Sequence, residues 1–176
     1  MEKWAVEGLS LEIQAKAIEL ENRINRNKDK VTAMLLGPGY PLGQLELRKE
    51  IASRLSDKGY HVVVMEAIQE WKEMSVGEKF KGILDKLNPD LFVCIFTKKG
   101  VPHGVIFEIG FICGHLGRDT AMQRLRFCVE EGVNKEELLT IYVREIMEIA
   151  KTYDYQDAEE LLDIVEGLIK DEILRR

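Results

Sequence analysis

Short apolar runs recur along the chain and alternate with longer segments of helical periodicity. Four of these runs predict strands at 31–36, 60–65, 91–96 and 124–129. The segment 147–153 suits either a continued helix or a fifth strand, of which a short strand is favoured. The runs lack the polar alternation of a sheet that faces water, which is typical of strands buried on both faces. Strands that alternate with helices predict a parallel sheet covered by helices on both sides.

Capping residues and apolar stripes indicate where the helices begin. Ser10 is placed to cap a helix over 9–28. Ser75 and Glu78 have the spacing of a capping box, and Asp157 is placed to cap the last helix. Further helices are expected at 42–58, after Pro102 and at 134–144. The terminal helices carry apolar stripes that would suit either the sheet or a second subunit, so a homo-oligomer is one expected outcome.

These elements predict a three-layer α/β fold with a parallel sheet of about five strands, helices on both faces and extra helices at both ends. A chain of 176 residues suits one domain with a substantial core. We expect that single domain to comprise an N-terminal helix within 1–29, a core over 31–130 and a C-terminal helical part over 134–176.

Composition and charge exclude several classes of function. The net charge of −6 argues against general nucleic-acid binding, which needs a basic surface. No run approaches the ~20 apolar residues of a membrane span. The N-terminus lacks the basic and apolar regions of a signal peptide. We therefore expect a soluble cytoplasmic protein that binds neither nucleic acid nor membrane.

The cysteines point away from disulfides and metal sites. Cys94, Cys113 and Cys128 are an odd number, and each lies in an apolar run. Buried, reduced thiols in a cytosolic protein fit this pattern. Cys113 and His115 do not have a zinc spacing, and no second pair of ligands accompanies them. Neither a metal nor another cofactor is therefore expected.

Glu108 is the only charged residue between Gly104 and Gly114. A helix here would be apolar nearly all round, as buried helices are. A carboxylate in such a helix must find partners, stay protonated or face a cleft. Burial of this kind tunes catalytic acids, bases and nucleophiles. The alternative is a carboxylate near a helix N-terminus that only stabilises the helix dipole.

Ligands of open parallel sheets bind beyond the carboxyl ends of the strands, where the strand order reverses. Three segments should meet at this edge, and they contain the candidate ligand contacts Gly37, Pro38, Gly39, Tyr40, Glu66 and Thr97. Gly37 and Gly39 would allow positive φ angles and a close approach of the backbone to a ligand. The following helix could receive a phosphate at its free amides, and Arg48 could add positive charge. The alternative is a plain strand-to-helix turn.

Two further polar residues could act with Glu108. Glu66 is either a solvated strand end or a second carboxylate in the same cleft, where like charges would raise one pKa and divide the roles of acid and base. His103 precedes the helix of Glu108 and could hydrogen-bond a ligand or orient Glu108. The alternative for His103 is a loop residue without chemistry. The candidate catalytic residues are therefore Glu108 and His103.

Several segments together carry a family resemblance. They are Val31–Gly39, Leu47–Ile51, Gly59–Glu66, Pro89–Thr97 and Gly104–Phe111. The series is similar to the nucleoside 2-deoxyribosyltransferase-like superfamily and its relatives among Toll/interleukin-receptor-like nucleotide-processing domains. It spans about residues 31–130, and its most specific element is Phe107-Glu108-Ile109-Gly110.

The resemblance implies a flavodoxin-like sheet and gives the candidate residues roles. Glu108 would attack or stabilise the anomeric carbon of an N-ribosyl bond, and the 37–40 loop would lie against the sugar or phosphate. Transferases of the family usually carry acidic residues shortly before the glutamate, but the segment 97–104 contains none. This difference favours a nucleotide glycosidase or a binding domain over a transferase. Lys98 and Lys99 in the same segment would suit a phosphorylated ligand.

Three hypotheses about function follow. The first is an N-glycosidase that acts on a nucleotide or nucleoside through Glu108, with water as the acceptor. The second is a nucleotide-sensing domain in which Glu108 holds ribose hydroxyls without reacting. The third is an oligomerisation module whose terminal helices form the interface. Fold alone does not choose among them.

Overall fold

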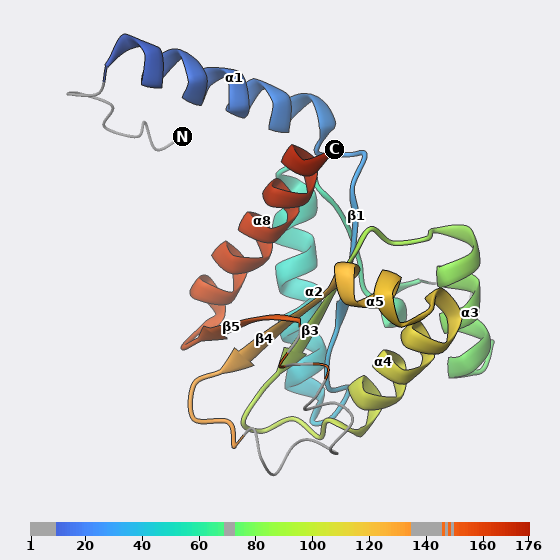
Figure 1. The fold of residues 1–176 in the computed structure, drawn as a ribbon. Helices are drawn as coiled ribbons and strands as arrows, with labels where there is room; N and C mark the ends of the chain where they lie inside the picture. Colours follow the sequence, from blue (N-terminus) through green and yellow to red (C-terminus); the bar gives the residue numbers. More distant parts are fainter. Residues whose placement is uncertain (1–9, 69–72, 135–145, 147, 149) are drawn as a thin grey trace.

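A computed structural model describes residues 10–68, 73–134, 146, 148 and 150–176 (Figure 1). Its centre is a five-stranded sheet with the order β2-β1-β3-β4-β5, in which every pair of neighbouring strands is parallel. The strands are β1 (Thr32–Leu36), β2 (His61–Val63), β3 (Leu91–Phe96), β4 (Leu125–Glu130) and β5 (Lys151–Tyr155). The predicted parallel, flavodoxin-like sheet is therefore confirmed.

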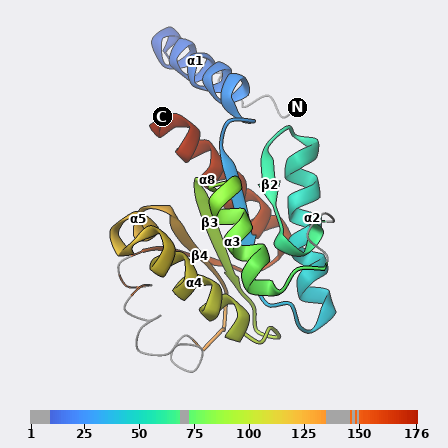
Figure 2. The same ribbon diagram turned by 90° about the vertical axis from the view of Figure 1, so that its right-hand side faces the viewer.

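Helices cover both faces of this sheet (Figure 2). One face is covered by α2 (Leu42–Asp57) and α8 (Ala158–Arg175). The other is covered by α3 (Val76–Lys86), α4 (His103–Leu116) and α5 (Arg118–Arg124). A short 3-10 helix, η1 (Met65–Ala67), follows β2. The three-layer α/β prediction is confirmed.

Alternate residues of the central strands serve the two faces of the sheet. On β3, Phe92 and Cys94 pack with α3 and α4, whereas Val93 and Ile95 pack with α2 and α8. All six residues of β3 are buried. The absence of polar alternation in the sequence therefore reflects two apolar faces, as expected for a parallel sheet between two helical layers.

The predicted caps are present. The Ser10 hydroxyl accepts a hydrogen bond from the Ile13 amide, and the Asp157 carboxylate accepts one from Glu160. Ser75 and Glu78 form both bonds of a capping box. The sequence pattern did not predict α5, because its seven residues are mostly polar and have no apolar stripe. The helix predicted at 134–144 lies almost wholly outside the described residues.

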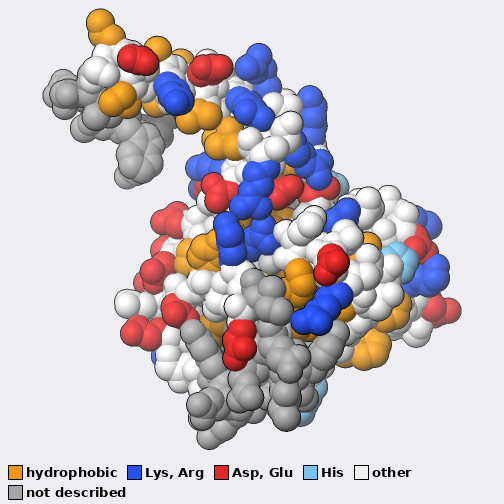
Figure 3. All heavy atoms as spheres, in the orientation of Figure 1, with side chains coloured by type: hydrophobic (Ala, Val, Ile, Leu, Met, Phe, Trp, Pro, Cys, Tyr) orange, Lys and Arg blue, Asp and Glu red, His pale blue; other side chains and the backbone are white. Residues whose placement is uncertain are grey.

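The N-terminal helix α1 (Leu11–Asn27) lies away from the body of the molecule (Figures 1 and 3). None of its residues is buried, although it contacts α8. Apolar side chains remain exposed on it, among them Leu11, Ile13, Ile18 and Leu20. Of the predicted stripe, Ile24 packs against the core. Burial against the sheet, one of the two expected outcomes for this helix, is thus largely absent in the chain as described.

All three cysteines of the chain are buried and none is in a disulfide, as predicted. Cys94 lies in the middle of β3, where burial raises the pKa of its thiol well above the usual range and the nearby Glu108 raises it further. Thiols in such surroundings stay protonated and unreactive. Among the helices that the structure describes, none has the length and apolar character needed to cross a membrane.

Candidate active site

The strand order reverses at the carboxyl ends of β1 and β3, which is where open parallel sheets usually bind ligands. From β1 the chain moves outward to β2 and then returns past β1 to β3, so this is the point at which the order reverses. The loop after β1 and the loop after β3 meet here, because the Val101 amide donates a hydrogen bond of 3.2 Å to the Tyr40 carbonyl. Segments that the sequence analysis placed at one edge therefore do lie together.

A partly buried ion pair braces this edge. Arg48 of α2 is 1% exposed, and its guanidinium donates to both carboxylate oxygens of Glu66, at 2.8 and 3.3 Å. It also donates to the Pro38 carbonyl at 3.3 Å. The two-pronged geometry is the strong form of this interaction. Glu66 therefore compensates the charge of Arg48. Arg48 does not offer a phosphate the free positive charge that was expected from the sequence.

Glu108 of α4 is buried, with 6% of its surface exposed. Burial raises the pKa of its carboxyl group to about 8; the positive charge of Arg48 opposes this shift, and the charge of Glu66 adds to it. The expected influence of Glu66 therefore has the right sign, but burial is the larger cause. At neutral pH the Glu108 side chain is mostly a neutral acid that can donate a proton.

Buried polar atoms without a hydrogen-bond partner gather in the segments that form this edge. In the described part of the chain they are Gln44 Oε1, Arg48 Nε, Thr97 Oγ1 and Glu108 Oε2. Each such atom costs roughly 1–3 kcal/mol when nothing satisfies it. Their concentration is typical of a site that exchanges hydrogen bonds with a ligand or water. Gln44 was missed from the sequence, because no motif marks it.

Close packing explains Gly37 and Gly100. Neither Gly37 nor Gly39 has a positive φ, so that expectation was wrong. A Cβ atom on Gly37 would instead lie 2.7 Å from Cδ of Arg48. Gly100 is a second such position, which no motif marks in the sequence. A Cβ atom there would lie 2.3 Å from Cγ of Pro38 and 2.6 Å from the Thr97 hydroxyl. The missing side chains let the loops close over the ion pair.

Gly37→Ala is expected to displace Arg48 and lower the free energy of unfolding by about 1–3 kcal/mol, the usual cost of overpacking. Gly39→Ala is the matched control, because nothing lies within 4 Å of the added Cβ atom. Urea unfolding of the two variants measures the difference. Equal stability of both variants would contradict the close contact between Gly37 and Arg48.

The remaining candidates lie nearer the surface. His103, the first residue of α4, is exposed, and among the described contacts no hydrogen bond joins it to Glu108. Tyr40 is 72% exposed. The Lys98 amide donates to Glu130 at 2.8 Å, and its ammonium group lies 3.8 Å from the same carboxylate. Lys98 is therefore partly neutralised, whereas Lys99 is exposed.

Two cavities lie elsewhere on the sheet. A cavity of about 310 Å³ lies at the carboxyl ends of β4 and β5, where its acidic lining includes Glu130 and Asp154. A second, of about 600 Å³, lies at the opposite edge. Glu108 lines neither of them. Among the described residues, no group of three or more His, Cys, Asp and Glu side chains could hold a metal ion.

Comparison with known proteins identifies similar folds. The CMP N-glycosidase BcmB of Clostridium botulinum superposes with a TM-score of 0.50 at 18% identity, over 78% of this chain and 98% of that chain. The SEFIR domain of interleukin-17 receptor B gives 0.49 at 13% identity, over 81% and 94%. No protein-family model matches the chain, and no curated protein matches it. At these identities the likeness to the glycosidase is one of fold.

Proposed function

We propose that this protein hydrolyses the N-ribosyl bond of a nucleotide or nucleoside and that Glu108 is its catalytic residue. The observation that carries the proposal is the carboxyl group of Glu108, which is buried beside the Arg48–Glu66 pair and has a pKa of about 8 and an unpartnered Oε2. Its place at the reversal of the strand order supports the same reading. So does the fold, which resembles that of a CMP N-glycosidase.

The protonation state of Glu108 defines its role in the reaction. The neutral carboxyl donates its proton to the base nitrogen as the bond from that nitrogen to C1′ breaks and the bonding electrons move to the base. The carboxylate that remains then faces the oxocarbenium ion, which it stabilises. Water adds to C1′ and returns a proton to Glu108. A carboxyl group that acts first as acid and then as base is the pattern of glycoside hydrolysis.

The surrounding polar groups would hold the sugar. The Thr97 hydroxyl and the Gln44 amide oxygen lack partners and can bind ribose hydroxyls. The Gly37–Tyr40 loop would lie along the sugar or phosphate, and Lys99 would add a positive charge near a phosphate. His103 would contact the ligand from the start of α4. A ligand has to enter between these loops, because Glu108 is almost wholly covered.

Incubation of the protein with pooled nucleosides and nucleotides tests the proposal. Chromatography should detect free base and the matching ribosyl product. A stabilising shift in Tm without any released base would favour the sensing function instead, in which the neutral Glu108 donates a hydrogen bond to the ligand. If no base is released and Tm does not shift, both the glycosidase and the sensing function are contradicted.

The pH dependence of kcat/KM distinguishes a proton donor from a nucleophile. Because the acid form of Glu108 reacts, kcat/KM should fall about tenfold per unit above pH 8, where that form is lost. A carboxylate nucleophile would give the opposite slope, with kcat/KM rising up to about pH 8. The decline should persist in His103→Asn, which removes the other candidate catalytic residue.

A further inference from the structure

The amino-terminal edge of the sheet, opposite Glu108, contains the larger cavity of about 600 Å³. Its basic lining residues are Arg124, Arg126, Lys151, Arg175 and Arg176. Only two carboxylates, Asp90 and Glu172, line it as well, which leaves a surplus of three positive charges. Lys and Arg side chains also gather on the surface beneath α1 (Figure 3). This accumulation is notable in a chain whose net charge is −6.

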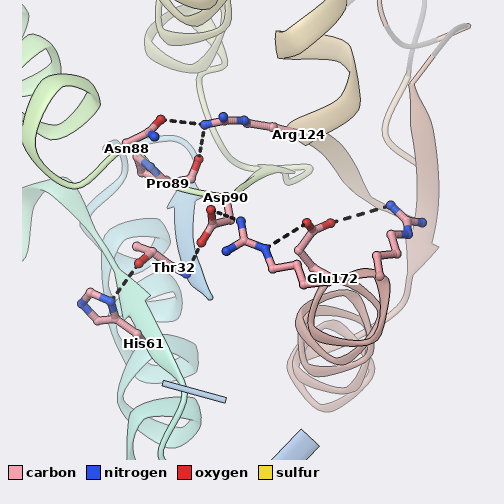
Figure 4. A network of polar contacts seen from close by, with 9 residues as sticks. Thr32, His61, Asn88, Pro89, Asp90, Arg124 and Glu172 are labelled. Carbon is pink, nitrogen blue, oxygen red and sulfur yellow. Dashed lines mark hydrogen bonds and ion pairs between the residues drawn. The ribbon is translucent and has the colours of Figure 1, made fainter. Parts of the chain in front are cut away.

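The two carboxylates of the cavity are already engaged (Figure 4). Asp90 accepts a hydrogen bond of 2.8 Å from the Thr32 amide and pairs with Arg176. Glu172 lies 3.7 Å from both Arg175 and Arg176. These contacts hold the two C-terminal arginines over the cavity.

In the described part of the chain no ion pair joins the other three cations to a carboxylate, although the charges of Glu172 and Asp171 act on Arg126. Arg124 donates to the neutral oxygens of Asn88 and Pro89, at 2.7 and 3.0 Å. Arg126 is 5% exposed and donates to two backbone carbonyls, each at 2.8 Å. Hydrogen bonds of this kind fix the position of a guanidinium without neutralising its charge.

Two of these cations lie side by side on neighbouring strands. Arg126 of β4 is the register partner of Lys151 of β5, so both project from the same face of the sheet. Burial, and then the charge of Arg175, lower the pKa of Arg126, whereas Tyr153, Glu172 and Asp171 act in the opposite direction. Like charges held together in this way repel each other, and a bound anion would relieve the repulsion.

We propose that this cavity binds a small polyphosphate anion, at a site separate from Glu108. Planar guanidinium groups match phosphate oxygens in pairs, and several of them here surround one space. The surplus of three charges matches a diphosphate or triphosphate group, and the volume is that of a small-molecule site. The phosphates could be free or could belong to a nucleotide. The proposal does not depend on the glycosidase activity.

Binding of sodium tripolyphosphate to the full chain, measured by calorimetry, tests the inference. We expect one site per chain and a dose-dependent rise in Tm. Arg175→Gln and Lys151→Gln should each weaken binding about tenfold, the effect of losing one charge-assisted hydrogen bond. Lys81→Gln is the control, because it removes an exposed lysine of α3 and should leave the affinity unchanged. Equal affinity of all four proteins would overturn the proposal, as would absence of binding.

Hydrogen exchange of the unaltered protein gives a second test that needs no variant. Tripolyphosphate should slow exchange at 122–126 and 172–176, and slowing confined to the loops around Glu108 would overturn the assignment. A nucleoside triphosphate measured in parallel identifies the source of the phosphates. Equal affinity for the two anions indicates recognition of phosphate alone, and tighter nucleotide binding at the same segments indicates that the cavity also holds the nucleoside.

Discussion

Glu108→Gln is expected to lower the rate of base release about 10³-fold, within the usual range for loss of a general acid. Glutamine keeps the size and polarity of the side chain but has no proton to give to the leaving base. The assay is chromatography of free base at pH 7 with the substrate found in the pooled screen. Glu46→Gln is the matched control, because it removes a glutamate that is 67% exposed on α2. Full activity of Glu108→Gln would exclude Glu108 as the catalytic residue.

The same substitution changes how stability depends on pH. The folded state raises the pKa of Glu108 from its ordinary value of 4.5 to about 8, so between these values the folded chain keeps a proton that the unfolded chain releases. The free energy of unfolding then falls by up to about 1.4 kcal/mol per pH unit through this window and levels off above it. Glu108→Gln should remove that slope. Urea unfolding at pH 5, 7 and 9 measures the effect and shows that the variant folds.

Arg48→Met is expected to destabilise the fold by about 3 kcal/mol, because it leaves Glu66 and the Pro38 carbonyl without their donor. This loss of stability is at the lower end of the range for broken buried ion pairs, because the Glu66 side chain is 29% exposed and water can hydrate its carboxylate once Arg48 is replaced. Urea unfolding at pH 7 measures the loss. Lys49→Gln, at the neighbouring position, whose side chain is 40% exposed, should change stability by less than about 0.5 kcal/mol.

A double-mutant cycle separates the ion pair from packing. If the ion pair accounts for most of the stabilisation, Glu66→Gln should lower the free energy of unfolding little further once Arg48→Met is present. The double variant should then be more stable than the sum of the two single effects predicts. Additive effects would show that the alkyl chain of Arg48, and not its charge, supports this edge of the sheet.

The strands β1 to β4 were predictable because each lies in an apolar run, whereas β5 (Lys151–Tyr155) is mostly polar and extends beyond the range 147–153 expected for it. Residues 91–96 are apolar throughout, and a strand between two layers of helices needs no other signal. The capping box of Ser75 and Glu78 was predictable for the same reason, since the residues that form it are three apart. Local patterns therefore predicted most helices and strands, and the alternation of strands with helices predicted the parallel sheet.

The contacts of the candidate site were less predictable, because they join distant segments. Arg48 and Glu66 pair through the relative placement of α2 and η1, which no local periodicity encodes. Arg126 and Lys151 become neighbours only through the register of β4 and β5. Glu108 was recognisable because a single charge in an apolar helix stands out in the sequence itself. Its high pKa depends on the depth of burial, which only the fold determines.

The burial of all three native thiols makes the chain convenient for spectroscopy. A cysteine introduced at an exposed position would react with maleimide reagents much faster than Cys94, Cys113 or Cys128. Gly39→Cys would place a fluorophore beside the loops of one edge, and Gln123→Cys, at an exposed and uncharged residue of the cavity lining, would place one at the other. Ligand arrival at either end could then be followed in real time without first replacing the natural cysteines.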